Sequence, residues 1–153
     1  MTPLDPRQLS VLRIRAGVMA ALLTLAAAAL DRLALRGSGL PLGAATGAAA
    51  LLGLALALMM PKRRYRGWSY RMDEDELHLR YGLWTRVRSV VPFGRVQHID
   101  VVHGPLQRLF GLGTLVLHTA GTRSAAVLLP GLAEEEAERM RDHIRHKIRE
   151  DLG

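Results

Sequence analysis

Histidine is the residue type in this chain best suited to metal binding or proton transfer, and the 153-residue sequence contains six histidines. Only His143 and His146 have a useful ligand spacing, because residues three apart lie on one face of a helix. Asp142 and Glu150 would add carboxylate oxygens on the same helix. The chain has no cysteine, which excludes thiolate metal sites, disulfides and a cysteine nucleophile. No His-Glu-x-x-His motif is present, so we predict a solvated helix face without a bound metal or cofactor.

The remaining polar residues do not form a catalytic motif. Ser89 and Ser124 lack the glycine context of a nucleophile elbow. Gly111-Leu-Gly113 is not a phosphate loop, since no Lys-Ser/Thr pair follows it and it does not open a helix. The acidic run 73–76 is predicted to be a solvated turn rather than a cation site. The sequence therefore predicts a protein that is not an enzyme.

Positive charge is the strongest polar feature of the sequence, with a formal net charge of +7. Arg86 and Arg88 have the same parity in a predicted strand, so they lie on one face of it. Together with Arg95 and the basic run 62–66, they are either candidate contacts for anionic lipid or an ordinary soluble surface. Much of the charge flanks apolar segments and no platform of stacking aromatic residues is present, so we predict no nucleic-acid partner.

The segment 105–113 is a second candidate contact region. It is too apolar for an ordinary solvated loop, and its glycines argue against a stable helix. Its large apolar residues either plug the open end of a sheet, which we favour, or present an apolar surface to a partner; they are Leu106, Leu109, Phe110 and Leu112. The loop is predicted to be held by hydrogen bonds from Gln97, His98 and Arg108.

Residues 1–66 are predicted to form a hairpin of two membrane-spanning helices. The spans are placed at about 12–34 and 42–60, lengths that suit the hydrocarbon core of a bilayer. Gly43 and Gly47 put two small residues on one face of the second helix. This spacing indicates either close packing against the first helix or the ordinary glycine content of membrane helices.

Basic residues flank the two spans on the same side of the predicted membrane. Arg7, Arg13 and Arg15 precede the charge-free core of the first span, which begins at Ala16, and the run 62–66 follows the second span. The predicted tight turn at 36–41 adds little positive charge. Because basic flanks remain in the cytoplasm, both termini and the C-terminal domain are predicted to be cytoplasmic. If residues 1–28 were instead a cleaved signal peptide, the second span would still leave that domain in the cytoplasm.

Residues 67–153 are predicted to form a mainly-β domain closed by a helix. Alternating apolar and polar residues indicate half-buried strands, placed at 68–72, 77–81, 86–91, 95–102, 114–120 and 124–129. A seventh strand is allowed near 104–110. Pro130-Gly131 is predicted to end the strands, and the stripe that follows indicates an amphipathic helix, with Leu132, Ala137, Met140, Ile144 and Ile148 on its apolar face. The predicted domain is a curved antiparallel sheet, or partly open barrel, of about six to seven strands capped by a C-terminal α-helix.

The run VPFGRVQHIDVVHGPLQRLFGLGTLVLHTAG at 91–121 resembles the YdbS-like bacterial pleckstrin-homology family, and the similarity covers residues 65–148. Members typically carry two membrane helices before this domain, as this chain is predicted to do. The resemblance implies a pleckstrin-homology fold in a multi-pass protein of the bacterial inner membrane. It implies no agreed activity.

These observations favour a membrane-anchored scaffold that binds itself or a similar membrane protein, with membrane lipids around its spans. The alternative is a sensor of anionic lipid headgroups at the inner leaflet. In eukaryotic pleckstrin-homology domains, basic residues near the first hairpin hold phosphoinositides. The corresponding turn here, 73–76, is acidic, which argues against headgroup binding of that type.

Overall fold

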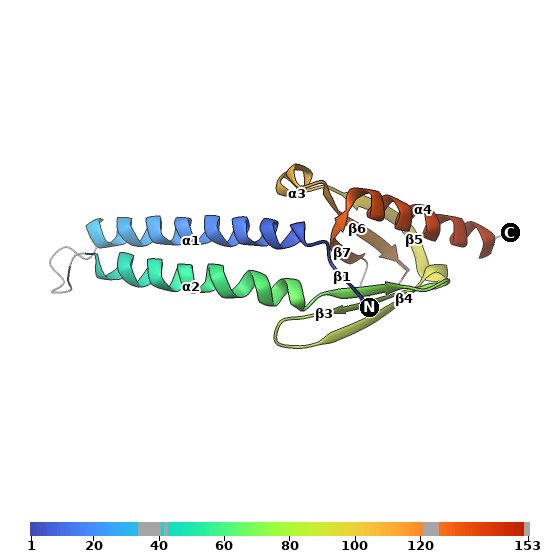
Figure 1. Cartoon of the computed structure of the whole chain (residues 1–153), viewed down its shortest axis with the longest axis horizontal. Coiled ribbons are helices and arrows are strands. Elements are labelled where there is room, and N and C mark those ends of the chain that lie inside the picture. Colours follow the sequence, from blue (N-terminus) through green and yellow to red (C-terminus); the bar gives the residue numbers. More distant parts are fainter. Residues whose placement is uncertain (34–40, 42, 121–125, 152–153) are drawn as a thin grey trace. The chain divides into compact units, whose positions relative to one another are not determined.

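The protein consists of two compact units in the computed structural model, which describes residues 1–33, 41, 43–120 and 126–151. Leu12–Arg63 forms an apolar unit. Met1–Val11 and Arg64–Gly153 together form the second unit, here called the β domain. Figure 1 shows the elements of both units in chain order. The turn predicted at 36–41 lies outside the described residues, apart from Pro41.

The apolar unit is built from α1 (Arg7–Leu33) and α2 (Ala44–Arg66), whose outer ends belong to the β domain. Both helices are long and apolar enough to cross a membrane. Most of their apolar side chains are exposed, which distinguishes them from the buried core helices of a soluble protein. The two predicted spans therefore correspond to two helices whose composition suits lipid.

A glycine on α2 allows the two helices to approach each other. Gly53 is buried, and a Cβ added there would lie 3.0 Å from the Cβ of Ala20. Gly43 and Gly47 have no described neighbour within 4 Å of such a Cβ. Among the described residues, close packing through a small residue occurs at Gly53 and not at the predicted pair. Such small-residue contacts are common between membrane helices.

The end of α1 is tied to the start of α2 by a buried carboxylate. Asp31 is 3 % exposed, and its Oδ2 accepts a hydrogen bond from the backbone N–H of Thr46 at 2.8 Å. The side chain therefore caps the first turn of α2, where unpaired N–H groups and the helix dipole favour negative charge.

Seven strands form two antiparallel sheets in the described part of the β domain. The first sheet has the order β1-β2-β3-β4 and the second β5-β6-β7. The strands are β1 (Thr2–Pro3), β2 (Ser69–Met72), β3 (Glu76–Tyr81), β4 (Val87–Pro92), β5 (Val96–Val102), β6 (Leu112–Thr119) and β7 (Ala126–Ala133). The C-terminal helix, α4 (Glu134–Asp151), packs against the second sheet and lies along it in Figure 1.

The core lies between the two sheets and α4. Leu77 and Leu79 of β3 and Leu115 of β6 are at most 1 % exposed and point into it. The predicted apolar stripe of α4 covers the same core through Met140 and Ile144. Each such side chain contributes about 1.5–3 kcal/mol when it is removed from water, so the alternation seen in the sequence determines which face of each strand is buried.

The sequence predicted one curved sheet or partly open barrel, whereas the structure has two separate sheets. The break is η1 (Phe93–Arg95), a 3-10 turn between β4 and β5. Phe93 is buried in the core, and this contact turns the chain from one sheet into the other. The coarser prediction is confirmed: two apolar helices are followed by antiparallel sheets and a C-terminal helix.

The segment 104–110 is not the seventh strand that the sequence allowed, because it forms the short helix α3 (Pro105–Leu109). Proline occupies the first helical position, where its missing N–H costs nothing. The side chain of Gln107 accepts a hydrogen bond from the Gly104 N–H at 3.1 Å, which satisfies a donor at the helix start. These local contacts outweigh the low helix propensity of the surrounding glycines.

The last strand is longer than predicted, since β7 continues through Pro130 and Gly131. Gly131 has a φ of 69°, a conformation that other residues rarely adopt, and an added Cβ would lie 2.5 Å from the Cγ of Gln8. Proline is tolerated because β7 lies at the edge of its sheet. The N–H of Asp5 donates to the Gly131 carbonyl at 2.9 Å, so the N-terminal segment covers this edge.

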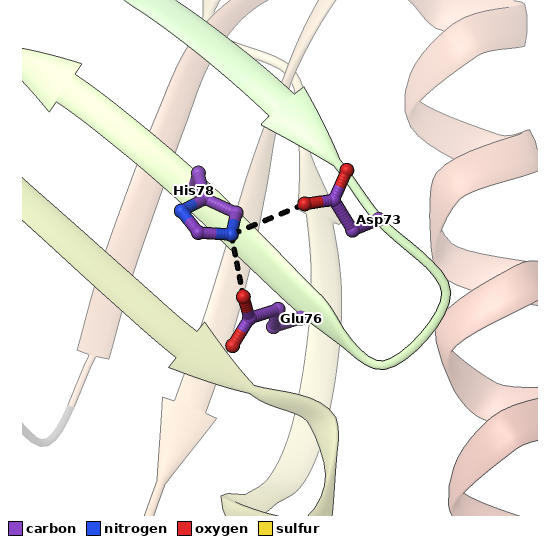
Figure 2. Close-up of side chains that lie close together, drawn as sticks. All are labelled: Asp73, Glu76 and His78. Atoms are coloured by element: carbon purple, nitrogen blue, oxygen red, sulfur yellow. Dashed lines mark hydrogen bonds and ion pairs between the residues drawn. The ribbon is translucent and has the colours of Figure 1, made fainter.

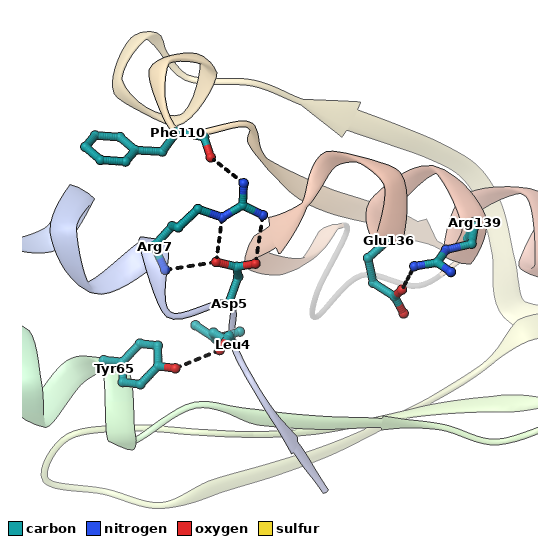
Figure 3. Close-up of polar contacts among 7 residues, drawn as sticks. All are labelled: Leu4, Asp5, Arg7, Tyr65, Phe110, Glu136 and Arg139. Carbon is teal, nitrogen blue, oxygen red and sulfur yellow. Dashed lines mark hydrogen bonds and ion pairs between the residues drawn. The ribbon is translucent and has the colours of Figure 1, made fainter.

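The N-terminal residues are part of the β domain. β1 pairs with β2, and Leu4 is buried in the core. Tyr65 Oη donates to the Leu4 carbonyl at 2.8 Å (Figure 3). The sequence assigned all of 1–66 to the membrane hairpin, whereas the structure places Met1–Val11 with the β domain. A two-residue strand leaves no periodic signal in a sequence, so this attachment is visible only in the structure.

Asp5 and Arg7 fix the start of α1 on the β domain. Asp5 Oδ1 accepts a hydrogen bond from the Arg7 N–H at 2.9 Å and caps the helix. The Arg7 guanidinium lies 3.0 Å from Asp5 Oδ2 and donates to the Phe110 carbonyl at 3.1 Å (Figure 3). The hydrogen bond from the Arg7 side chain lowers the pKa of Asp5 below its ordinary value of 3.8. We call these contacts, together with the bond between Tyr65 and Leu4, the N-terminal clamp.

We expect Asp5→Asn to lower the free energy of unfolding of the β domain by about 1 kcal/mol at neutral pH, because a hydrogen-bonded ion pair is lost. The native pKa of Asp5 lies below the unfolded value, so its stabilising effect is complete above pH 3.8 and is lost as the pH falls through the native pKa. The difference between wild type and variant should therefore shrink at acid pH.

Denaturant unfolding in mild detergent measures this effect. The two tryptophans of the chain are Trp68 and Trp84, both in the β domain, so fluorescence reports on that unit. Asp142→Asn removes an exposed neighbour of Arg141 and is the matched control. An equal loss in both variants, or a difference that does not change with pH, would contradict the prediction.

Candidate functional site

A pair of arginines without an acidic partner among the described residues lies on the outer face of the first sheet. Arg80 of β3 is directly opposite Arg88 of β4. Leu79 points into the core, so both arginines point outward. Like charges at opposed positions of two strands are destabilising. Arg80, Arg86 and Arg88 have no ion-pair partner in the part of the chain that the structure describes, so this surface can receive an anion.

The turn between β3 and β4 adds an exposed aromatic residue to these arginines. Trp84 is 80 % exposed, an unusual position for the largest apolar side chain. Gly82 has a φ of 129°, and an added Cβ would lie 1.8 Å from the Thr85 carbonyl oxygen, so this position of the turn requires glycine. We call Arg80, Trp84, Arg86 and Arg88 the basic hairpin.

The basic hairpin is close in the chain and in space to the end of α2. Trp68 follows Arg66, the last residue of α2, by two positions. Its ring stacks on Tyr81 with centroids 4.8 Å apart, and Tyr81 immediately precedes the turn. The hairpin is therefore held at the same end of the β domain as Trp68, just after the end of α2.

The opposite end of the same strands is acidic, and three of its four carboxylates have a basic partner. His78 Nε2 lies 2.6 Å from Glu76 Oε1 and 3.2 Å from Asp73 Oδ2 (Figure 2). Arg71 binds the same Asp73 oxygen at 2.8 Å. Lys147 of α4 approaches Asp75 at 3.7 Å. Residues 76 and 80 are separated by about 13 Å along the strand, so the acidic turn does not lie beside the basic hairpin.

Asp73, Glu76 and His78 place three donor atoms within 4.8 Å of one another, the spacing of a metal site. The Arg71 guanidinium already occupies the Asp73 oxygen that would serve as ligand. The contacts also close the turn between β2 and β3, with the Asp73 N–H donating to the Glu76 carbonyl at 3.0 Å. We therefore interpret the cluster as the solvated turn that the sequence predicted.

The structure separates Arg95 from the other candidate arginines. Arg95 lies in η1, beyond the far end of β4 from Arg88, and its side chain is exposed. Its carbonyl accepts a hydrogen bond from Ala120 at 3.0 Å. Arg86 and Arg88 instead share their surface with Arg80, which sequence reasoning missed. The alternation Leu77-His-Leu-Arg-Tyr81 placed Arg80 on the polar face of its strand, but the register with β4 was needed to set it opposite Arg88.

The apolar residues of the segment 105–113 are divided between core and solvent. Leu112 begins β6 and is completely buried, while Leu106 and Phe110 are half-buried. Leu109 is 80 % exposed. Leu112 is buried, as a residue that plugs the sheet would be. Leu109 on α3 is exposed, as a residue of an apolar contact surface would be.

A buried glutamine, rather than the predicted residues, holds this segment. Gln107 is 6 % exposed, and its amide donates to Thr114 Oγ1 at 3.0 Å. The carbonyl of Leu112 receives a hydrogen bond from His103 Nδ1 at 3.0 Å. The sequence had assigned this role to Gln97, His98 and Arg108, which no described side-chain hydrogen bond ties to the loop.

His143 and His146, the two histidines of α4, contact different partners. His146 lies 3.3 Å from Glu150, while the His143 ring faces Phe93 with centroids 6.3 Å apart. The structure instead brings together His98 and His118, directly opposite each other on β5 and β6. They share the Asp100 carboxylate, with Nε2 atoms 2.9 and 3.2 Å from its two oxygens.

The model of the bacterial PH domain family matches residues 11–148, which include both apolar helices and the β domain. The chain belongs to the bacterial PH domain family. The resemblance noted in the sequence is therefore confirmed, and the match extends further toward the N-terminus than the motif block. No solved structure matches the chain.

Two curated relatives come from Bacillus subtilis (strain 168). The chain is 38% identical over 99 residues to the UPF0699 transmembrane protein YdbS, covering 64% of this chain and 60% of YdbS. It is 29% identical over 82 residues to the UPF0699 transmembrane protein YdbT, covering 53% of this chain and 17% of YdbT. The match thus spans less than two thirds of either relative. This bacterial PH domain protein is similar to transmembrane proteins, and its own helices have the composition to span a membrane.

Proposed function

We propose that this bacterial PH domain protein is a non-enzymatic, membrane-anchored binding protein whose β domain contacts anionic lipid through the basic hairpin. The observation that carries the proposal is the opposed pair Arg80 and Arg88, which has no described acidic partner, beside the exposed ring of Trp84. An arginine near an anionic leaflet contributes about 1 kcal/mol. Tryptophan favours the interface between headgroups and hydrocarbon.

The acidic turn does not oppose this proposal. Three of its four carboxylates face Arg71, His78 or Lys147, and it lies at the other end of β3. Trp68 lies two residues after the end of α2, and it stacks on Tyr81, which immediately precedes the turn of the basic hairpin. If α2 spans the bilayer, the short connection from Arg66 to Trp68 keeps the start of the β domain near the membrane surface.

Quenching of Trp84 fluorescence by brominated lipid tests the proposal. The full-length Trp68→Phe variant retains an aromatic partner for Tyr81 and leaves Trp84 as the sole tryptophan. In vesicles containing brominated phosphatidylglycerol, we expect strong quenching. Adding Arg80→Gln and Arg88→Gln removes about 2 kcal/mol of attraction, so quenching should fall to the level seen in brominated phosphatidylcholine.

The matched control is Arg108→Gln with Arg139→Gln, which removes the same charge from two exposed positions outside the basic hairpin and should leave the quenching unchanged. Equal quenching in the neutral and anionic vesicles, or equal loss in both double variants, would refute lipid contact through the basic hairpin.

The proposal includes a multi-pass topology with both termini and the β domain in the cytoplasm, based on the basic flanks of the two spans. The natural chain has no cysteine, so Glu74→Cys introduces a single exposed thiol in the β domain. We expect a membrane-impermeant maleimide to label this thiol only after the cells are permeabilised. Labelling in intact cells would place the domain on the outside.

A second candidate function is a subunit or scaffold in a membrane protein complex, with itself or a similar membrane protein as the partner. The specific observation is Leu109, which α3 holds in solvent although the neighbouring Leu112 is completely buried. An exposed leucine on a well-anchored turn is suited to become the buried centre of an interface.

Purification from native membranes tests this second function. Leu109→Asp should remove a stoichiometric partner, or the self-association, without changing the stability by more than about 0.5 kcal/mol, because the side chain is exposed. Leu128→Asp, at another exposed leucine, is the control. Retention of the partner in Leu109→Asp would exclude this surface.

A further inference from the structure

A groove of about 410 Å³ lies between α4 and β5, away from the basic hairpin. Three arginines of α4 line it: Arg141, Arg145 and Arg149. Gln97 and His98 line it from β5, and Ile99 and Ile148 provide apolar surface. No carboxylate is among these lining residues. The Asp100 carboxylate, on the same strand, is shared between His98 and His118.

Two of the three groove arginines, Arg145 and Arg149, differ from the other basic residues of α4. Arg139 is paired with Glu136 at 2.6 Å (Figure 3), and Lys147 lies 3.7 Å from both Glu150 and Asp75. Arg145 and Arg149 have no acidic partner among the described residues. Arg141 is paired with Asp142 at 2.9 Å, so the two cations of this helix without a described partner, Arg145 and Arg149, both line the groove.

The spacing of these cations specifies the kind of anion. Arg141, Arg145 and Arg149 follow one another by four residues, so they form a row on one face of α4. Like charges at this spacing destabilise a helix. The row is about 12 Å long, which exceeds the reach of a single phosphate. Guanidinium groups bind phosphate oxygens through paired hydrogen bonds, better than an ammonium group does.

We propose that the groove between α4 and β5 is a binding site for a ligand that carries two neighbouring phosphate groups. Arg145 and Arg149 hold the phosphates, Arg141 extends the row, and Gln97 and His98 offer polar groups from the facing strand. Ile99 and Ile148 contact the apolar part of the ligand. The ligand is either a soluble diphosphate or a lipid headgroup with two phosphates. This site is separate from the lipid contact proposed for the basic hairpin.

Binding of sodium pyrophosphate and of cardiolipin to the full-length protein tests this site and distinguishes the two sources. Titration calorimetry in non-ionic detergent measures pyrophosphate affinity, and native mass spectrometry counts bound cardiolipin against phosphatidylcholine. Measurements near physiological ionic strength screen non-specific attraction. Arg145→Gln with Arg149→Gln should weaken binding by about tenfold or more, because two charge-assisted contacts are lost. Both side chains are exposed, so the fold is retained.

The matched control is Arg108→Gln with Arg139→Gln, which removes the same charge from two exposed positions outside both the groove and the basic hairpin and should leave the affinity unchanged. Loss of pyrophosphate binding only in the α4 variant supports a soluble diphosphate. Loss of cardiolipin alone in that variant supports a lipid headgroup. Absence of binding to both probes, or equal loss in both double variants, overturns the proposal whatever the outcome of the quenching experiment on Trp84.

Discussion

The β domain depends on the attachment of the N-terminal residues to a fold that is otherwise built from the last part of the chain. Leu4 enters the core, and Asp5 caps α1 while it binds Arg7. Tyr65, in the last turn of α2, donates to the Leu4 carbonyl. Closing so long a loop costs chain entropy, but this cost grows only slowly with loop length, and burial of Leu4 and the clamp contacts offset it. The start of α1 and the end of α2 are consequently held by the same core.

Acidic and basic residues lie at opposite ends of the outer face of the first sheet. The acidic end forms ion pairs that stabilise the turn, whereas the basic end is left to bind a ligand. At the turn after β2, the carboxylates of Asp73 and Glu76 contact Arg71 and His78. At the turn after β3, Arg80 and Arg88 oppose each other with no described acid nearby. On α4 the same contrast recurs between the ion-paired residues Arg139, Arg141 and Lys147 and the groove arginines Arg145 and Arg149, which have no described acidic partner. In both places, neighbouring arginines repel each other and lower the stability of the domain. A bound anion would offset this repulsion.

Much of the fold could be predicted because periodicity is local. Alternation in Leu77-His-Leu-Arg-Tyr81 and Thr114–Thr119 indicated strands, and the apolar stripe after residue 131 indicated α4. Parity placed Arg86 and Arg88 on one strand face. The candidate sites were less predictable because they depend on pairing across the chain: Arg80 meets Arg88 through strand register, and His98 meets His118 in the same way. Arg95 has the right charge but lies beyond η1, where the chain changes sheets.

The sequence by itself determined the two apolar helices, the strands and the amphipathic C-terminal helix, since each is encoded in composition or in a short repeat of side-chain polarity. The bacterial PH domain family was indicated by the resemblance of the run at 91–121. Only the tertiary structure decided that Met1–Val11 belongs to the β domain, that the strands divide into two sheets, that Leu109 is exposed beside a buried Leu112, and that α4 and β5 enclose a basic groove. The physical reason is that these features result from contacts between segments far apart in the chain. Such contacts are selected by burial and by pairing of polar groups, and no local pattern records them.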